Sequence, residues 1–247
     1  MKYLQLTGSA LGAAALLAGC GGGGGGDAAA PAPAAASYAF VTPKQGAHLV
    51  YAETLLDNRN NTVNRSSTDD VTAVNADGGF AMHEEDPSHN RVFSGTVDQS
   101  LYPTDYQLNA AGQAVGWTVA QPAGTIACAV TQGSVGAPAT LALGAGWNTS
   151  YTETCGTGPG TAFTQTGSFA GIETITIAAG TFKAYRIVSM TTRTVAGVTR
   201  TETATRWRDA SGGDTRTLKF TSQFSYSGAT PPDGALVSFS RELQSAR

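Results

Sequence analysis

The chain of 247 residues has little charge, few cysteines and no long apolar run. Charged residues make up only 13% of it, and the formal net charge is −3. Intrinsic disorder would require fewer apolar residues and more net charge, so most of the chain is expected to fold. Neither a cofactor nor a nucleic-acid partner is expected.

Sequence signatures of common enzymes are missing as well. Beyond residue 36 no segment keeps an apolar period of 3.6, which argues against long helices. No G-x-S-x-G pentapeptide marks a hydrolytic serine. The glycines of Gly156–Gly160 precede no helix that would hold a phosphate at its N-terminus. A non-enzymatic role is therefore favoured, and the alternative is an envelope hydrolase whose site is assembled from scattered residues.

The N-terminal segment has the order of a secretory signal peptide. Lys2 precedes the apolar run LGAAALLA (residues 11–18), which Gly19 and Cys20 follow. The run is too short for a membrane span of about 20 residues. The sequence LAGC that ends at Cys20 resembles the lipobox of bacterial lipoproteins. An ordinary signal peptide with an incidental cysteine is the alternative.

The resemblance implies cleavage before Cys20, a diacylglycerol on its thiol and an acylated (palmitate-type) amino terminus. Gly21 stands where an aspartate often marks retention in the inner membrane, which favours the outer membrane. The predicted domains are a signal peptide (1–19), a lipidated cysteine with a Gly/Ala/Pro tether (20–36), and one antiparallel β domain (37–247). The expected location is the cell envelope, on the periplasmic or the surface face.

Two cysteines remain for the folded domain, Cys128 and Cys155. In an exported protein such a pair indicates a disulfide. A metal site would need histidines near either cysteine, and neither has one. We therefore predict a Cys128–Cys155 disulfide.

Alternation of apolar and polar residues predicts strands, and Thr217–Tyr226 is the clearest example. The short signal Ala196–Gly197 predicts a hairpin between Phe182–Arg193 and Val198–Arg208. The other expected strands are His48–Leu55, Asp70–Val74, Gly79–His83, Arg91–Val97, Asp105–Asn109, Ala114–Ala120, Thr125–Val130, Gly146–Thr154, Ala162–Phe169 and Ala235–Leu243. The predicted fold is an all-β, antiparallel meander of about a dozen strands that forms a strongly curved sheet or barrel.

The hairpin register sets Trp207 opposite Arg186 and predicts one apolar face as the candidate ligand-lining surface. This register also sets Arg193 opposite Arg200, which a three-residue turn with a bulge would avoid. The expected lining residues are Val188, Met190, Trp207, Leu218, Phe220, Phe224 and Tyr226. The expected reverse face carries Arg193, Arg200, Glu202, Arg206 and Arg208.

Basic residues concentrate after Lys183 and acidic residues before it. The favoured interpretation is a solvated arginine face that meets the acidic half of its own domain. The alternative is an arginine face turned toward an anionic surface such as lipid headgroups.

The segment GIETITIAAGTFKAYRI (Gly171–Ile187), followed by RWRDASGGDTRTLKF, resembles the C-terminal part of bacterial envelope lipoproteins of unknown function. Their AGTF turn, two long strands and tryptophan-containing strand are matched here. The resemblance implies a β domain in the envelope and carries over no catalytic residue. Arg206–Arg208 departs from the usual pattern.

The segment MHEEDPSHN combines His83 and His89 with three carboxylates. Imidazole and carboxylate groups suit divalent metals, but metal sites usually draw on distant segments, and the stretch reads as an acidic loop. No metal is expected there.

The domain is expected to cover its apolar face by curling, because no helix is available to do so. A barrel filled by its own side chains is favoured. An interior of roughly 300 Å³ or more would instead admit an apolar guest. The expected partners are the membrane, through the lipid anchor, and either an apolar ligand or another envelope component.

Overall fold

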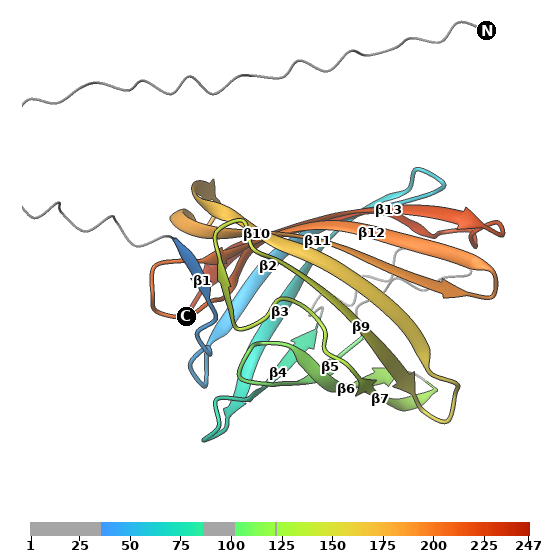
Figure 1. Ribbon diagram of the computed structural model, residues 1–247, viewed down its shortest axis with the longest axis horizontal. Helices are drawn as coiled ribbons and strands as arrows, with labels where there is room; N and C mark the ends of the chain where they lie inside the picture. Colours follow the sequence, from blue (N-terminus) through green and yellow to red (C-terminus); the bar gives the residue numbers. More distant parts are fainter. Residues whose placement is uncertain (1–35, 86–101, 122) are drawn as a thin grey trace, which may run out of the picture. The chain divides into compact units, whose positions relative to one another are not determined.

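The computed structural model describes residues 36–85, 102–121 and 123–247. These residues contain no helix, and so none that is long and apolar enough to cross a membrane. They form fourteen strands (Figure 1). The strands are β1 (Ser37–Ala39), β2 (His48–Asp57), β3 (Thr62–Val74), β4 (Phe80–Glu85), β5 (Thr104–Leu108), β6 (Ala114–Gln121), β7 (Gly124–Gln132), β8 (Thr140–Ala142), β9 (Gly146–Cys155), β10 (Thr161–Ile177), β11 (Gly180–Val195), β12 (Val198–Asp209), β13 (Thr217–Gly228) and β14 (Leu236–Ala246).

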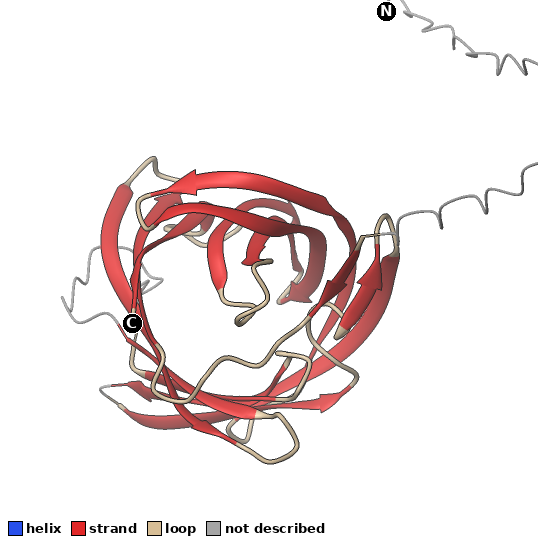
Figure 2. Cartoon of the chain, turned by 90° about the vertical axis from the view of Figure 1, so that its left-hand side faces the viewer, coloured by secondary structure: helices blue, strands red, loops and turns tan. Residues whose placement is uncertain are grey.

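Twelve of the described strands close into one antiparallel barrel, which Figure 2 shows as a ring. Their order is β10-β11-β12-β13-β14-β2-β3-β4-β5-β6-β7-β9, so most neighbours also follow one another in the chain. The pairing of β9 with β10 closes the ring. The predicted all-β meander and its closure are confirmed. The expected strand at Arg91–Val97 lies outside the described residues.

The short strands β1 and β8 pair with each other rather than with the barrel. Tyr38 stands opposite Leu141 in this small sheet. Both side chains are buried, and they pack with Phe169 and Ile187 of the barrel. Strands of three residues are too short to show an alternation, which is why the sequence did not predict them.

The hairpin of β11 and β12 has the expected two-residue turn at Ala196–Gly197, with φ of 50° and 77°. Two positive φ values belong to a type I′ turn, which matches the twist of the strands. Trp207 stands opposite Arg186, as predicted, and Arg193 stands opposite Arg200. The three-residue turn with a bulge is therefore excluded.

The aromatic side chains of β13 share a face with the arginines of β12. Phe220 stands opposite Arg206, and Tyr226 stands opposite Arg200. Residues directly opposite on paired strands lie on the same face. This face turns into the barrel, because Arg206 lines the interior cavity described below. The expectation that the arginine face is solvated is therefore wrong for Arg206.

The prediction that Val188, Met190 and Trp207 share an apolar face with the aromatic side chains of β13 is also wrong. These three residues lie on the outer face of the barrel. They alternate with the inward-facing residues of β11 and β12, and the side chain of Met190 is 47% exposed. Trp207 donates its indole N–H to Glu173. Leu218 is fully buried in a core cluster, against which Trp207 also packs. That cluster comprises Leu49, Tyr51, Ile177, Ala184, Leu218 and Leu243.

Cys128 of β7 and Cys155 of β9 stand directly opposite one another. Their sulfur atoms are 2.06 Å apart, at disulfide distance, and their Cα atoms are 4.0 Å apart. This supports the expected disulfide. The pair links β7 and β9. The chain between these two strands leaves the barrel and forms β8.

Candidate functional site

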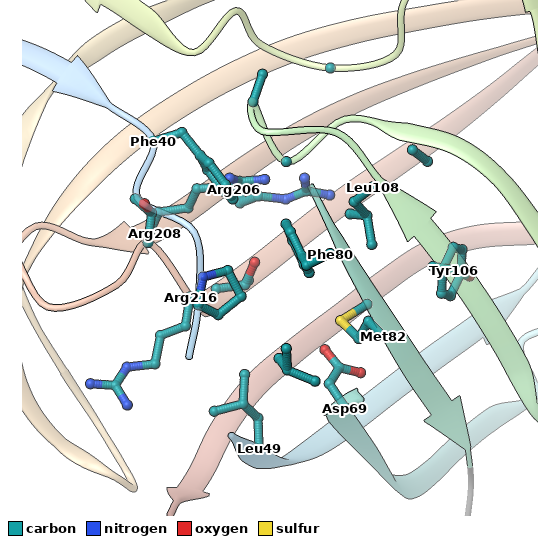
Figure 3. Close-up of a pocket in the computed structure, with 18 of the residues that line it drawn as sticks. Phe40, Leu49, Asp69, Phe80, Met82, Tyr106, Leu108, Arg206, Arg208 and Arg216 are labelled. Carbon is teal, nitrogen blue, oxygen red and sulfur yellow. The ribbon is translucent and has the colours of Figure 1, made fainter. Parts of the chain in front are cut away.

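A cavity of about 330 Å³ lies inside the barrel. Its walls come from β2 to β5 and from β12 to β14, with additions from the segment before β2 and from the loop between β7 and β8. The barrel is therefore not filled by its own side chains, contrary to the favoured expectation. Much of the wall is apolar (Figure 3). The apolar lining includes Phe40, Leu49, Val71, Phe80, Met82 and Leu108.

The segment after β1 lines part of this cavity through Phe40 and Pro43. The backbone N–H of Thr215 donates to the carbonyl of Val41 at 3.0 Å, and the hydroxyl of Thr42 donates to the carbonyl of Gly78 at 2.8 Å. The segment is thus fastened both to the connection between β12 and β13 and to the turn between β3 and β4. Figure 2 looks onto the end of the barrel where the C-terminus lies, and loops cross the opening there.

A cluster of charged side chains occupies another part of the interior. Arg241 of β14 pairs with Asp69 at 2.5 Å, with Glu84 at 3.1 Å and with Glu53 at 3.2 Å. Its guanidinium lies 3.8 Å from the centre of the Tyr51 ring. The three carboxylates come from β2, β3 and β4, so a single arginine connects four neighbouring strands.

The cluster shifts the pKa values of its members. Burial raises the pKa of Glu84 to about 7, and the charges of Asp69 and Glu53 add to this while Arg241 opposes it. Burial also raises the pKa of Asp69. Burial alone would lower the pKa of Arg241, but Asp69 and Glu84 hold it above its ordinary value. The guanidinium stays charged, and the carboxyl of Glu84 holds a proton that it releases near neutral pH.

Arg206 and Arg208 follow one another on the inner face of β12 and line the same cavity. The guanidinium carbon of Arg206 is 4.9 Å from the ring centre of Phe220. That of Arg208 is 5.1 Å from the ring centre of Phe40. Burial lowers the pKa of Arg206 to about 10, and the charge of Arg208 adds to this. Arg206 therefore remains a cation at neutral pH.

The predicted lining residues do not form this cavity. None of the seven is among the residues that line it. Tyr226 lines a separate hollow of about 480 Å³ with Arg193 and Arg200. The inward direction of Arg206 and Arg208 could have been predicted from their alternation next to the alternating aromatic residues of β13. Cys20 lies outside the described residues.

The acidic stretch after Met82 is not a loop in its described part. Met82 to Glu85 belong to β4, which turns Glu84 into the barrel and His83 outward. The carboxylate of Asp105 accepts a hydrogen bond from the ring of His83 at 2.8 Å, which raises the pKa of His83. Asp86 and His89 lie outside the described residues. The absence of a metal there stays a prediction.

No family model matches the chain, and no curated protein matches its sequence. Solved structures do show a likeness. One is a Bacteroides fragilis protein described as exported and as having a YmcC-like fold. It has a TM-score of 0.49 and 8% sequence identity, over 85% of this chain and 99% of the other.

A second is a protein from Parabacteroides distasonis described as a lipoprotein. It has a TM-score of 0.45 and 12% identity, over 85% of this chain and 99% of the other. A third is the hypothetical lipoprotein YmcC from Escherichia coli. It has a TM-score of 0.36 and 11% identity, over 78% of this chain and 85% of the other. At these TM-scores the likeness carries no argument, and the fold of this chain rests on its own strand pairing.

Proposed function

We propose that the protein is a lipid-anchored lipoprotein of the bacterial cell envelope whose barrel binds a small ligand and catalyses no reaction. The observation that carries the binding role is the interior cavity of about 330 Å³. Its volume lies in the range of small-molecule sites, roughly 300–1,000 Å³. Its wall combines apolar side chains with a few charged groups, as such sites usually do.

The anchor is proposed from the sequence. Residues 1–19 act as a signal peptide, Cys20 carries the lipid, and residues 20–36 tether the domain 37–247 to the membrane. Several acyl chains hold a protein stably where one chain does not. The outer membrane is the proposed location because Gly21 rather than aspartate follows Cys20.

The composition of the cavity wall supports binding over hydrolysis. Nucleophilic hydrolysis needs a serine, cysteine or threonine within hydrogen-bond reach of a base. No histidine, serine or cysteine is found among the described residues that line the cavity. Its threonines, Thr215 and Thr217, therefore have no imidazole beside them in this wall.

Native mass spectrometry of the protein isolated from its envelope tests the binding role. A noncovalent adduct should accompany the covalently lipidated chain. Val71 lines the cavity and is buried, so Val71→Phe should fill the cavity and remove the adduct. Val115→Phe is the matched control, because Val115 is 46% exposed. A wild-type mass without any adduct, or an adduct that survives Val71→Phe, would count against the proposal.

A further inference from the structure

The arginines that line the cavity fall into two kinds. Arg241 pairs with Asp69, and Arg216 pairs with Asp209 at 3.1 Å. Arg206 and Arg208 form no ion pair with a carboxylate anywhere in the described parts of the chain, and their contacts are with aromatic groups. One section of the wall therefore carries two guanidinium groups that form no ion pair in the described residues, although the more distant charge of Glu202 acts on Arg206.

The hydrogen-bonding groups of these two side chains are also incompletely used. The Nη1 of Arg208 donates to the hydroxyl of Tyr38 at 3.2 Å, but its Nε–H is buried and has no acceptor. Glu202 lies on the same face of β12, but its carboxylate pairs with Arg200, at 3.8 Å. Buried charges and buried donors cost free energy unless they are paired. A bound anion would supply acceptors for these groups.

The cation pair borders the apolar part of the same cavity. Phe40 lies under Arg208 and also stacks on Phe80, with ring centres 6.1 Å apart and planes at 12°. Beyond Phe80 the wall continues with Met82 and Leu108, as Figure 3 shows. A molecule that enters would thus meet two guanidinium groups at one end. Beyond Phe80 it would meet a largely apolar wall, in which the carboxylates of Asp69 and Glu84 are paired with Arg241.

We propose that the cavity binds a single-chain anionic amphiphile, with Arg206 and Arg208 holding its carboxylate or phosphate group and the apolar wall holding its chain. The inference rests on the proposed function and names the class of ligand. Guanidinium groups present planar forks of donors that match both carboxylate and phosphate. The cavity lies near the lower end of the usual volume range, which favours one chain over the two chains of a phospholipid.

The charge requirement can be tested with three probes of equal chain length: dodecanoate, dodecyl phosphate and dodecan-1-ol. The full chain carrying Cys20→Ser would be titrated with each in detergent-free buffer, by calorimetry. The two anions should bind one to one, with a Kd at least tenfold lower than that of the alcohol. The tighter of the two identifies the head group as a carboxylate or a phosphate. Inorganic phosphate, which has no chain, should bind far more weakly.

The residue requirement needs a charge-matched comparison. Arg206→Gln/Arg208→Gln should raise the Kd of the anions at least tenfold and leave that of the alcohol unchanged. Arg186→Gln/Lys219→Gln removes two cations from the outer face and should leave both values unchanged. Near-ultraviolet circular dichroism would show that each variant is folded.

The outcomes separate this inference from the proposed function. Equal affinity for the alcohol and the anions, or anion binding that Arg206→Gln/Arg208→Gln leaves unaltered, would overturn the anionic ligand while the cavity remains a binding site. Inorganic phosphate that binds as tightly as dodecyl phosphate would overturn the role of the apolar wall. A folded chain that binds none of the probes and carries no adduct from the envelope would overturn both.

Discussion

Arg206 of β12 stands directly opposite Phe220 of β13, with its guanidinium carbon 4.9 Å from the centre of the phenyl ring. A diagonal contact of the same kind lies further along the inner face, where the guanidinium carbon of Arg200 is 5.2 Å from the ring centre of Phe224. An aromatic face attracts a cation and replaces part of its lost hydration, but it supplies no counter-charge. The interior thus contains a region around Arg241, where charges are paired, and a section of β12 where Arg206 and Arg208 form no ion pair within the described residues.

The pairing around Arg241 makes this residue a sensitive point for stability. Arg241→Met keeps much of the side-chain volume but leaves the carboxylates of Glu53, Asp69 and Glu84 without this cation. The free energy of unfolding at neutral pH should fall by about 3–5 kcal/mol, the usual result of breaking a buried ion pair.

Urea denaturation of Arg241→Met and of wild type measures this difference. Arg186→Met provides the control, because the ion pair of Arg186 with Glu173 is exposed and loose at 3.9 Å and is expected to contribute no more than about 1 kcal/mol. A loss of similar size in both variants would contradict the role given to Arg241.

Glu84 makes stability depend on pH. Its pKa in the folded chain is about 7, against an ordinary value of 4.5. The folded state therefore binds more protons than the unfolded state between these values, and the stability due to this proton is lost as the pH rises from about 4.5 to about 7. The total is roughly 3 kcal/mol, at about 1.4 kcal/mol per pH unit.

Glu84→Gln should flatten the stability profile over this range. Asp69, whose pKa is also raised, leaves some slope. Thermal or urea unfolding at several pH values gives the measurement. Glu85→Gln changes the neighbouring carboxylate on the outer face and should preserve the wild-type slope. Identical slopes in Glu84→Gln and wild type would show that Glu84 does not hold this proton.

The class of fold follows from the sequence because alternation is a local signal. Thr217–Tyr226 alternates over its whole length, and the Ala196–Gly197 turn fixes the hairpin register. The assignment of faces failed at the next step, between β12 and β13. Trp207 stands opposite Lys219, not opposite a phenylalanine. A register error of one residue exchanges the two faces of a strand, and only the structure resolves it here.

The cavity could not be predicted for a different reason. Its wall joins Phe40, Phe80 and Arg208, which are far apart in the chain. The inward direction of the cavity arginines was not predicted either, because a buried arginine without a partner is rare and arginines are expected to face water. The inward position of the Glu84 carboxylate was not predicted for a similar reason, since an acidic stretch is typical of a loop.

The disulfide should contribute to stability through the loop that it closes. Cys128 and Cys155 are 27 residues apart, and the chain-entropy model gives about 3–4 kcal/mol for a loop of this size. Cys128→Ala/Cys155→Ala should lower the free energy of unfolding by that order. Peptide mapping of non-reduced protein from the envelope should find the linked peptides. Two free thiols in that material would contradict the disulfide.

Cys20 is predicted to determine the membrane association of the protein. Cys20→Ser removes the thiol that would receive the lipid, so an uncleaved or soluble species should replace the processed, membrane-bound form. Cell fractionation and intact mass measurement check both properties. Ser9→Ala, which changes another small residue of the signal segment, should be processed normally. Normal processing and continued membrane fractionation of Cys20→Ser would refute the lipid anchor.

Arg206 should lower the stability of the empty protein, because its charge is buried without a carboxylate partner in the described residues. Arg206→Met keeps the stem over Phe220 and removes the charge. Relief of the burial cost outweighs the lost cation–aromatic contact. The free energy of unfolding of ligand-free Arg206→Met should therefore exceed that of wild type by about 1 kcal/mol.

The order should reverse when dodecanoate is present. A ligand at 100 times its Kd stabilises the folded state by about 2.7 kcal/mol, and Arg206→Met loses much of this gain because it binds the anion weakly. Thermal unfolding of both proteins, with and without dodecanoate, shows whether the order of their stabilities reverses. Arg186→Met should follow wild type in both conditions. If Arg206→Met is less stable than wild type both with and without dodecanoate, Arg206 has a structural role that outweighs the cost of burying its charge. That result would contradict its proposed role as an anion-binding residue.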